Sequence, residues 1–330
     1  MGTIATTPGL TYSQARRVLR DGTKLFRGVY FLPSEPDESP SLLDRARAAL
    51  LVCPPGSAIC GITALALTGL DLPRPFEDQA RGPVHVLLPT RAQVGRVEPN
   101  RPELVLHRER SPRPTWRWER AGLLMARLDH CWAQVVARHL KGQVGPFLPA
   151  PDPALRGQFT SGARQAFLEC VQLGDALVRR QDPLIKHDRF VAYIQGLSQL
   201  KGVRAARAAF RYVRPQTDSP NETWLRLIAL DAGFPEPAIN HRLQVRMRDR
   251  LLDLGWIDRM IALEYHGAQH FNDPIQARDD VSRRGQLQGL GWVVVEAVYR
   301  DLLQPADLIG RLTAAFAGRP APDKRAAPGT

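Results

Sequence analysis

The sequence has few of the residues that cross-link a fold or hold a metal, and each shortage excludes a class of protein. Its four cysteines, Cys53, Cys60, Cys131 and Cys170, match neither a disulfide framework nor a zinc-binding spacing. The eight histidines include no H-E-x-x-H motif. The sequence shows no signal peptide and no apolar run long enough to span a bilayer. We therefore expect a soluble, cytoplasmic protein without a membrane partner.

Acidic residues are also in short supply relative to basic ones. The chain has 45 Lys and Arg against 33 Asp and Glu, which gives a formal net charge of +12 over 330 residues. So basic a balance indicates an anionic partner, and arginine, which dominates the basic set, suits phosphates and guanine edges. We therefore expect DNA as the partner of a chain long enough for two or three domains.

The first 36 residues have the order of a winged helix, a DNA-binding fold. A helical pattern runs from Ser13 to Arg20 and stops at Gly22, and the strand-like segment Lys24–Leu32 follows it. A basic helix before a basic β-ribbon is typical of a module whose helix enters the major groove. The predicted DNA contacts are Arg16, Arg17, Arg20, Lys24 and Arg27. The alternative is a small amphipathic helix packed on a hairpin.

Residues 41–204 predict a middle region that mixes helices and strands, after the proline-rich linker Pro33–Pro40. The pattern predicts helices at Leu42–Val52, Ala58–Leu70, Leu123–Leu140 and Gly162–Val178, and strands at Val84–Pro89 and Leu104–His107. Arginines alternate with Trp116 and Trp118 in the segment between these strands and the third helix. Such a mixture can stack on bases, but an edge strand with amphipathic side chains is the favoured interpretation.

A C-terminal α/β domain is predicted over residues 205–318, followed by a disordered tail at 319–330. Ser219 is an N-cap, Pro220 suits the first helical position, and Glu222 stands where a capping-box acid belongs. From there the expected order is helix, three strands, helix, strand, helix. The later elements are the strand Ala238–Arg246, the helix Asp279–Leu290 and the last helix Leu302–Ala315.

Residues 250–271 read as a tight β-hairpin with its turn at Asp258–Arg259. Pairs across this hairpin have numbers that add to a constant: Trp256 with Ile261, Leu254 with Leu263, Leu252 with Tyr265, Gly255 with Ala262, Asp253 with Glu264, and Leu251 with His266. Because strand side chains alternate between faces, the first three pairs form an apolar face and the last three place two carboxylates and an imidazole on the other. A one-residue slip would destroy this segregation.

The opposed carboxylates of Asp253 and Glu264 predict a divalent-cation site. Directly paired residues have Cβ atoms roughly 5 Å apart, and two carboxylates so close repel unless a proton or a metal lies between them. Oxygen ligands with open positions suit Mg²⁺ or Mn²⁺. Asp258, at the turn, is the weaker candidate. The alternative is a solvated sheet face on which acids align by chance.

Several motifs together resemble the Vsr-like endonuclease group of the PD-(D/E)xK nuclease superfamily. They are S-P-N-E-T-W-L-R-L-I-A-L-D-A-G-F-P-E-P, L-D-L-G-W, L-E-Y-H-G-A-Q-H-F and G-L-G-W-V-V-V, and the resemblance covers residues 205–315. It implies a restriction-endonuclease-like fold and a Mg²⁺- or Mn²⁺-dependent DNA endonuclease. It also implies that Asp253, Glu264 and Glu222 are the metal ligands.

The chain departs from that family at one position. The lysine expected two residues after the motif glutamate is His266 here, so the activation of water falls to His266, to His270 or to the metal alone. Upstream, G-I-T-A-L-A-L-T-G-L, V-H-V-L-L-P and L-G-D-A-L-V-R-R resemble an architecture in which an AbiEi-type antitoxin-like winged helix precedes the nuclease-like domain. A DNA-binding regulator with an inactive nuclease domain therefore stays open, as do a homodimer and a toxin–antitoxin partner.

Overall fold

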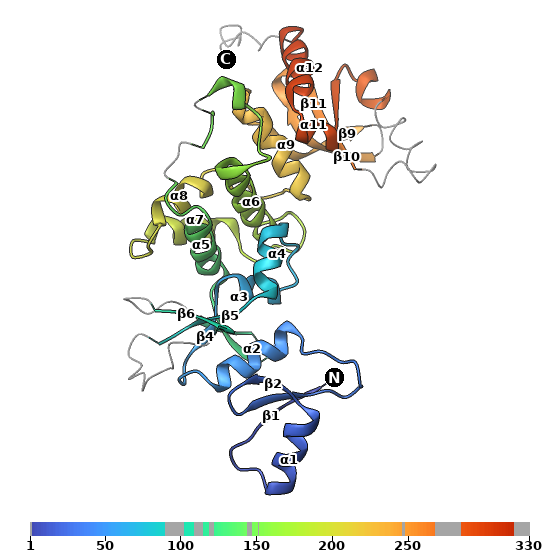
Figure 1. Ribbon diagram of the computed structural model, residues 1–330. Coiled ribbons are helices and arrows are strands. Elements are labelled where there is room, and N and C mark those ends of the chain that lie inside the picture. The colour runs from blue at the N-terminus through green and yellow to red at the C-terminus, as the bar shows by residue number, and fades with distance from the viewer. Residues whose placement is uncertain are drawn as a thin grey trace. The chain divides into compact units, whose positions relative to one another are not determined.

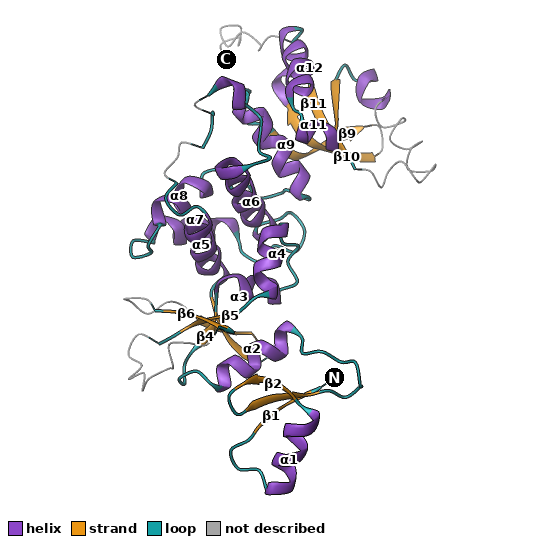
Figure 2. Cartoon of the chain, viewed as in Figure 1, coloured by secondary structure: helices purple, strands orange, loops and turns teal. Residues whose placement is uncertain are grey.

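The computed structural model describes residues 2–89, 102–108, 115–118, 122–143, 147–150, 152–245, 248–267 and 285–319. The chain forms two compact units: Met1–Lys141 with Asp188–Ala206, and Gly142–His187 with Arg207–Thr330 (Figure 1). Both combine helices with β-sheet, so the chain is a mixed α/β protein, as expected (Figure 2). Within the described ranges no helix is long and apolar enough to cross a membrane.

The first unit begins with the predicted basic helix and two-stranded ribbon. A third strand, which was not predicted, precedes the helix and pairs with the ribbon. The helix α1 (Tyr12–Asp21) starts at a Thr11–Gln14 capping box. The strands β1 (Thr3–Thr6), β2 (Thr23–Phe26) and β3 (Val29–Leu32) form an antiparallel sheet in the order β1-β3-β2. Gly28, with a φ of 76°, supplies the left-handed residue between β2 and β3. The winged helix itself stays a prediction.

The rest of the first unit consists of a five-stranded sheet, in the order β6-β5-β4-β8-β7, and the helices around it. Its elements are α2 (Leu42–Leu51), β4 (Ala58–Ile59), α3 (Gly61–Leu67), α4 (Arg74–Arg81), β5 (Val84–Leu87), β6 (Leu104–His107), β7 (Thr115–Trp118), β8 (Leu123–Ala126), α5 (Leu128–His139) and α7 (His187–Gly196). The segment with the two tryptophans, β7, is an edge strand, as favoured. The helices predicted at 58–70 and 123–140 were wrong at their starts, because β4 and β8 are short apolar strands that periodicity does not separate from buried helix.

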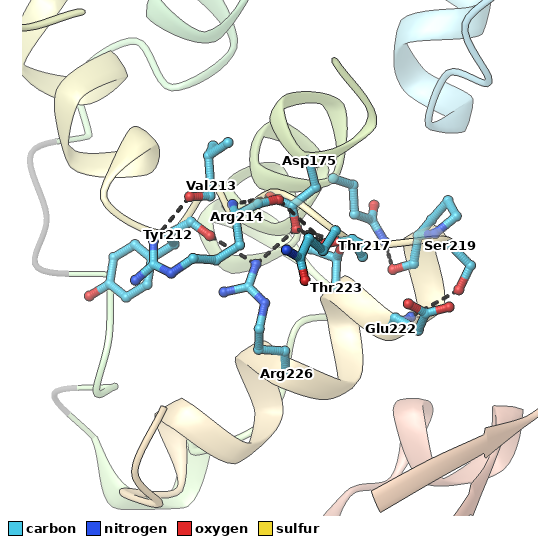
Figure 3. A network of polar contacts seen from close by, with 12 residues as sticks. Asp175, Tyr212, Val213, Arg214, Thr217, Ser219, Glu222, Thr223 and Arg226 are labelled. Atoms are coloured by element: carbon cyan, nitrogen blue, oxygen red, sulfur yellow. Dashed lines mark hydrogen bonds and ion pairs between the residues drawn. The ribbon is translucent and has the colours of Figure 1, made fainter. Parts of the chain in front are cut away.

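The second unit contains a helix that the sequence analysis assigned to the middle region. This helix, α6 (Gly162–Leu177), packs on α9 (Pro220–Asp231). Asp175 of α6 accepts hydrogen bonds from the backbone N–H of Arg214 (2.7 Å), from Thr223 Oγ1 (2.8 Å) and from Arg226 Nη2 (2.8 Å), as Figure 3 shows. The predicted boundary at residue 205 therefore differs from the observed division, in which residues 142–187 join the C-terminal unit. The helix α8 (Val203–Phe210) runs across that division.

The C-terminal sheet has the order β12-β11-β10-β9. Its strands are β9 (Ala238–Val245), β10 (Arg248–Trp256), β11 (Ile261–His266) and β12 (Val293–Val298), and β12 runs parallel to β11 while the other neighbours are antiparallel. Residues 285–289 are helical between β11 and β12. The expected order from Ser219 is therefore confirmed. The last helix is interrupted near Pro305, which divides it into α11 (Tyr299–Leu303) and α12 (Ala306–Ala317).

The two central strands of this sheet, β10 and β11, are covered on both faces near the turn that joins them. On one face Trp256 contacts Phe316 of α12 and Phe234, with ring centroids 5.1 and 6.4 Å apart. On the other, Ala262 packs with Leu287 and Trp292. Each fully buried large side chain contributes roughly 1.5–3 kcal/mol, so the two layers hold β10 and β11 firmly.

Candidate functional site

The predicted register of the hairpin is confirmed next to its turn. The three recorded pairs of β10 with β11 are Leu254 with Leu263, Gly255 with Ala262, and Trp256 with Ile261. A short 3₁₀ turn, Ile257–Arg259, joins the strands, and Met260 ends it in a left-handed conformation with a φ of 51°. Asp258 therefore lies exposed at the turn, as predicted.

Farther from the turn, the predicted backbone pairing of Asp253 with Glu264 is not observed, and the Asp253 side chain contacts β11 instead. The described ladder between β10 and β11 ends at Leu254. Beyond it, Asp253 Oδ2 accepts a hydrogen bond of 2.8 Å from the backbone N–H of Tyr265. A carboxylate held by a neighbouring strand in this way has a fixed position beside the sheet. The same interruption corrects the predicted faces, because Leu252 packs with Ala262 instead of lying with Leu254.

Glu222 has the predicted place at the start of α9 and a second role in addition. Its backbone N–H donates to the Ser219 hydroxyl (3.2 Å), which confirms the N-cap (Figure 3). Its carboxylate Oε2 accepts hydrogen bonds from the Asp218 N–H (3.0 Å) and from Asn240 Nδ2 (2.9 Å). Burial, with a further contribution from the negative charge of Asp253, raises the pKa of Glu222 to about 7. The two carboxylates are therefore close enough to interact.

Glu222 and Asp253 line one pocket of about 350 Å³. The lining residues are Asp218, Glu222, Asn240, Asp249, Arg250, Leu251 and Asp253. Two of its acids are paired with arginines: Asp218 with Arg180 at 2.5 Å and Asp249 with Arg242 at 3.1 Å. Glu222 and Asp253 are the two acids of this lining whose charges interact with each other, since the negative charge of Asp253 contributes to the raised pKa of Glu222.

Glu264 and His266, the other predicted site residues that the structure describes, lie one strand away. Glu264 is buried and is not among the residues that line the pocket. His266 Nε2 lies 3.2 Å from Glu296 Oε1, and Glu264 is the register partner of Glu296 across β11 and β12. His270 lies outside the described residues. Among the described residues no three His, Cys, Asp or Glu side chains converge closely enough to hold a metal ion, so the predicted three-carboxylate set is not assembled there.

Two further residues of this region, Asn240 and Glu296, were not predicted from the sequence. Asn240 stands in the middle of β9 and bonds to Glu222. Asparagine is disfavoured in strands, so its presence in the strand sequence A-I-N-H-R-L indicates a specific role for this residue. Glu296 interrupts the otherwise apolar run V-V-V-E-A-V of β12, and a single acid in an apolar strand is likewise a signal of a specific role.

The basic residues predicted to contact DNA are exposed in the first unit. They are Arg16, Arg17 and Arg20 of α1, with Lys24 of β2 and Arg27 of the following turn. Asp21 pairs with Arg20 at 2.7 Å and lies 3.9 Å from Arg17. On the same helix Tyr12 is 83% exposed and Leu19 is 59% exposed. Apart from Val18, which is buried, most side chains of α1 are therefore exposed to solvent.

Comparison with known proteins adds relatives but no function. Two curated proteins of Mycobacterium tuberculosis, from strains H37Rv and CDC 1551, are each 29% identical to this chain over 114 residues, and both are described as uncharacterized. The match covers 34% of this chain and 42% of each relative, so the chain spans less than half the length of these relatives. No family model and no solved structure matches the chain.

Glu222→Gln is expected to stabilise the protein at alkaline pH. Because the pKa of Glu222 is raised to about 7 in the folded protein, from 4.5, folding favours its protonated form. The wild type therefore loses stability between about pH 4.5 and 7, by up to roughly 3 kcal/mol, and the glutamine variant does not. Thermal unfolding at pH 4.5 and pH 8 measures this: the variant should gain on the wild type only at pH 8. An equal effect at both pH values would mean that the acid is simply a cap.

Proposed function

We propose that the C-terminal unit is a divalent-metal-dependent DNA endonuclease with a restriction-endonuclease-like fold. The observation that carries the proposal is the shared pocket of Glu222 and Asp253, set in a core of helix, three antiparallel strands, helix and parallel strand. The order of elements agrees with the resemblance described above. The net charge of +12 favours a polyanionic substrate.

The donor set of the pocket fits a hard cation. Glu222 and Asp253 offer only oxygen ligands, which Mg²⁺ and Mn²⁺ prefer, and the pKa of Glu222 is raised by burial and by the negative charge of Asp253. A bound cation would polarise the scissile phosphate and lower the pKa of a water molecule. The chain itself would hold the two carboxylates, Asp253 through the Tyr265 N–H and Glu222 through Asn240. Glu264 is the third proposed ligand, although it lies on the neighbouring strand outside this pocket and would have to approach it when the cation binds.

His266 is the proposed proton acceptor in place of the family's lysine. Its Nε2 lies 3.2 Å from Glu296 Oε1, so the carboxylate orients the ring and stabilises the imidazolium that forms when the ring takes a proton. An imidazole beside a carboxylate can take a proton from water near neutral pH, whereas a lysine would supply a permanent charge. His270 is the second proposed acceptor.

The test of the proposal is cleavage of supercoiled plasmid by the purified full chain. Nicking or linearisation with Mg²⁺ or Mn²⁺ that EDTA stops would support it. Calorimetry with Mn²⁺ belongs beside the assay, because a DNA-binding regulator does not need the cation. A chain that binds DNA but neither binds Mn²⁺ nor cuts would favour the second function, a DNA-binding regulator.

The exposed basic residues of α1 support this second function, DNA binding by the first unit. We expect an affinity for duplex DNA that falls steeply with salt, because each neutralised phosphate contributes about −0.9 to the slope of log K against log salt. The double substitution Arg16→Gln with Arg17→Gln should reduce that slope by about 2. Fluorescence anisotropy with labelled duplex measures it.

The matched control removes two exposed arginines elsewhere in the same unit. Arg189→Gln with Arg204→Gln changes the net charge equally and lies on α7 and α8. It should leave the slope close to that of the wild type. Equal slopes for both double variants would show that only the total charge matters and that α1 makes no specific DNA contact.

A further inference from the structure

Asn240 has an unusual backbone for a residue within a strand. Its φ is 46°, in the left-handed region that few residues other than glycine adopt. On either side of it the ladder between β9 and β10 is regular, with Leu252 paired to His241 and Leu254 paired to Ile239. The pair between them, Asn240 with Asp253, is absent from the described ladder. The left-handed residue therefore opens the sheet opposite Asp253.

The side chain of Asn240 is fixed by two hydrogen bonds. Its Nδ2 donates to the Gln216 carbonyl (2.8 Å) and to Glu222 Oε2 (2.9 Å), and the residue is buried. An amide nitrogen has two hydrogens, so both are used. The first bond ties the side chain to the loop before α9, and the second ties Glu222 to β9. One residue of β9, the strand beside Asp253, thus holds both the loop before α9 and the acid at the start of α9.

These bonds determine what the two acids present to the pocket. Oε2 of Glu222 already accepts from Asn240 and from the Asp218 N–H, which fixes the carboxylate in one orientation. Asp253, released from the ladder at Asn240, reaches the Tyr265 N–H instead. Removing a side chain that orients the ligands of a metal site typically costs about 10–100-fold in metal affinity.

We propose that Asn240 is the positioning residue of the acid pocket: its left-handed backbone frees Asp253 from the ladder, and its amide holds Glu222 opposite. The inference rests on the proposed function where it concerns a cation, and on the geometry alone where it concerns the link between Asn240 and Glu222. Backbone strain of this kind persists where the surrounding structure requires it.

The test compares two variants that separate backbone from side chain. Asn240→Gly keeps the left-handed conformation at no steric cost and removes the amide. It should weaken Mn²⁺ binding to the full chain about tenfold in calorimetry, and the loss of the two hydrogen bonds should lower the thermal midpoint modestly. Asn240→Ala also strains the backbone and should lower both. Wild-type Mn²⁺ affinity in the glycine variant would overturn the proposal.

Gln216→Gly is the matched control. Gln216 also has a left-handed backbone, with a φ of 73°, and its exposed side chain can be removed while its carbonyl still accepts from Asn240. Its Mn²⁺ affinity should equal that of the wild type. A tenfold loss in this variant as well would mean that any change in the loop disturbs the pocket, and Asn240 would have no special part.

A double-mutant cycle separates this inference from the proposed function. Asn240→Gly and Glu222→Ala are combined, and the thermal midpoints are measured without metal. Because the two side chains share a hydrogen bond, their effects should be clearly non-additive. If the wild type binds no Mn²⁺, the nuclease proposal fails and a non-additive cycle still supports the link. Additive midpoints would overturn the link whatever the metal result.

Discussion

Asp253→Asn is expected to abolish metal-dependent cleavage of DNA. Removing a residue that merely orients a metal ligand typically costs 10–100-fold in metal affinity or activity, so the loss of a ligand itself should cost at least about 100-fold. The amide keeps the shape of the side chain and can still accept from the Tyr265 N–H, which now bonds to Oδ2. The fold should therefore survive. Plasmid nicking measures the effect, with thermal unfolding as the check on folding.

Two comparisons make this result specific. DNA affinity in EDTA should stay near wild type or rise slightly, because the substitution removes a negative charge that repels phosphate. Asp258→Asn removes the same charge at the exposed turn and should change neither cleavage nor affinity, since asparagine suits a tight turn equally well. Cleavage that survives Asp253→Asn but not Asp258→Asn would move the chemistry to the turn and end the case for the pocket.

The hairpin was predictable because its pattern admits one register. Trp256, Leu254, Ile261 and Leu263 fall on one face in a single alignment, and a slip of one residue would put the two residues of one strand on the face opposite the other two. The interruption at Asp253 was not predictable in the same way. It depends on the backbone conformation of Asn240, a residue of another strand, and no local pattern in β10 reports it.

The properties of the acidic residues likewise divide into those that local sequence predicts and those that depend on packing. The N-cap at Ser219 follows from four consecutive residues, and the structure confirms it, but the Glu222 carboxylate accepts from the Asp218 N–H and not from the Ser219 N–H that a capping box requires. Its place beside Asp253, its burial and its raised pKa depend on how α9 docks against the sheet. The spacing between Glu264 and Asp253 was likewise read from an ideal ladder, and the actual ladder ends one residue too early to pair them.

The placement of α6 lay beyond the sequence for a related reason. Its pattern predicted a helix correctly, but nothing in the pattern says which domain a helix joins. The decision is made by Asp175, which bonds to partners 39 to 51 residues later in the chain. Contacts of that range are invisible to periodicity, so the division of the chain had to come from the structure.

Asp175→Asn is expected to destabilise the C-terminal unit by about 3–5 kcal/mol. Arg226 is fully buried, and the substitution would leave its guanidinium without the carboxylate 2.8 Å away. Its other acidic partner, Glu236, lies 3.5 Å away and is 39% exposed, so solvent screens that contact. For a unit of this size such a loss lowers the melting temperature by roughly 10 °C. Differential scanning calorimetry or circular dichroism would measure it.

A matched pair of variants tests whether the unpaired buried charge is the cause. Asp182→Asn makes the same chemical change at a side chain that is 91% exposed and 3.9 Å from Arg179, and it should change the melting temperature little. Adding Arg226→Met to Asp175→Asn removes the stranded charge while keeping an unbranched side chain in the core, and should recover at least half of the lost stability. If the double variant is instead less stable than the single one, the guanidinium contributes mainly through its bond to the Tyr212 carbonyl (2.8 Å). The stability that Arg226 contributes would then come from its hydrogen bond to the loop before α9 and not from its ion pair with Asp175, both of which belong to the network in Figure 3.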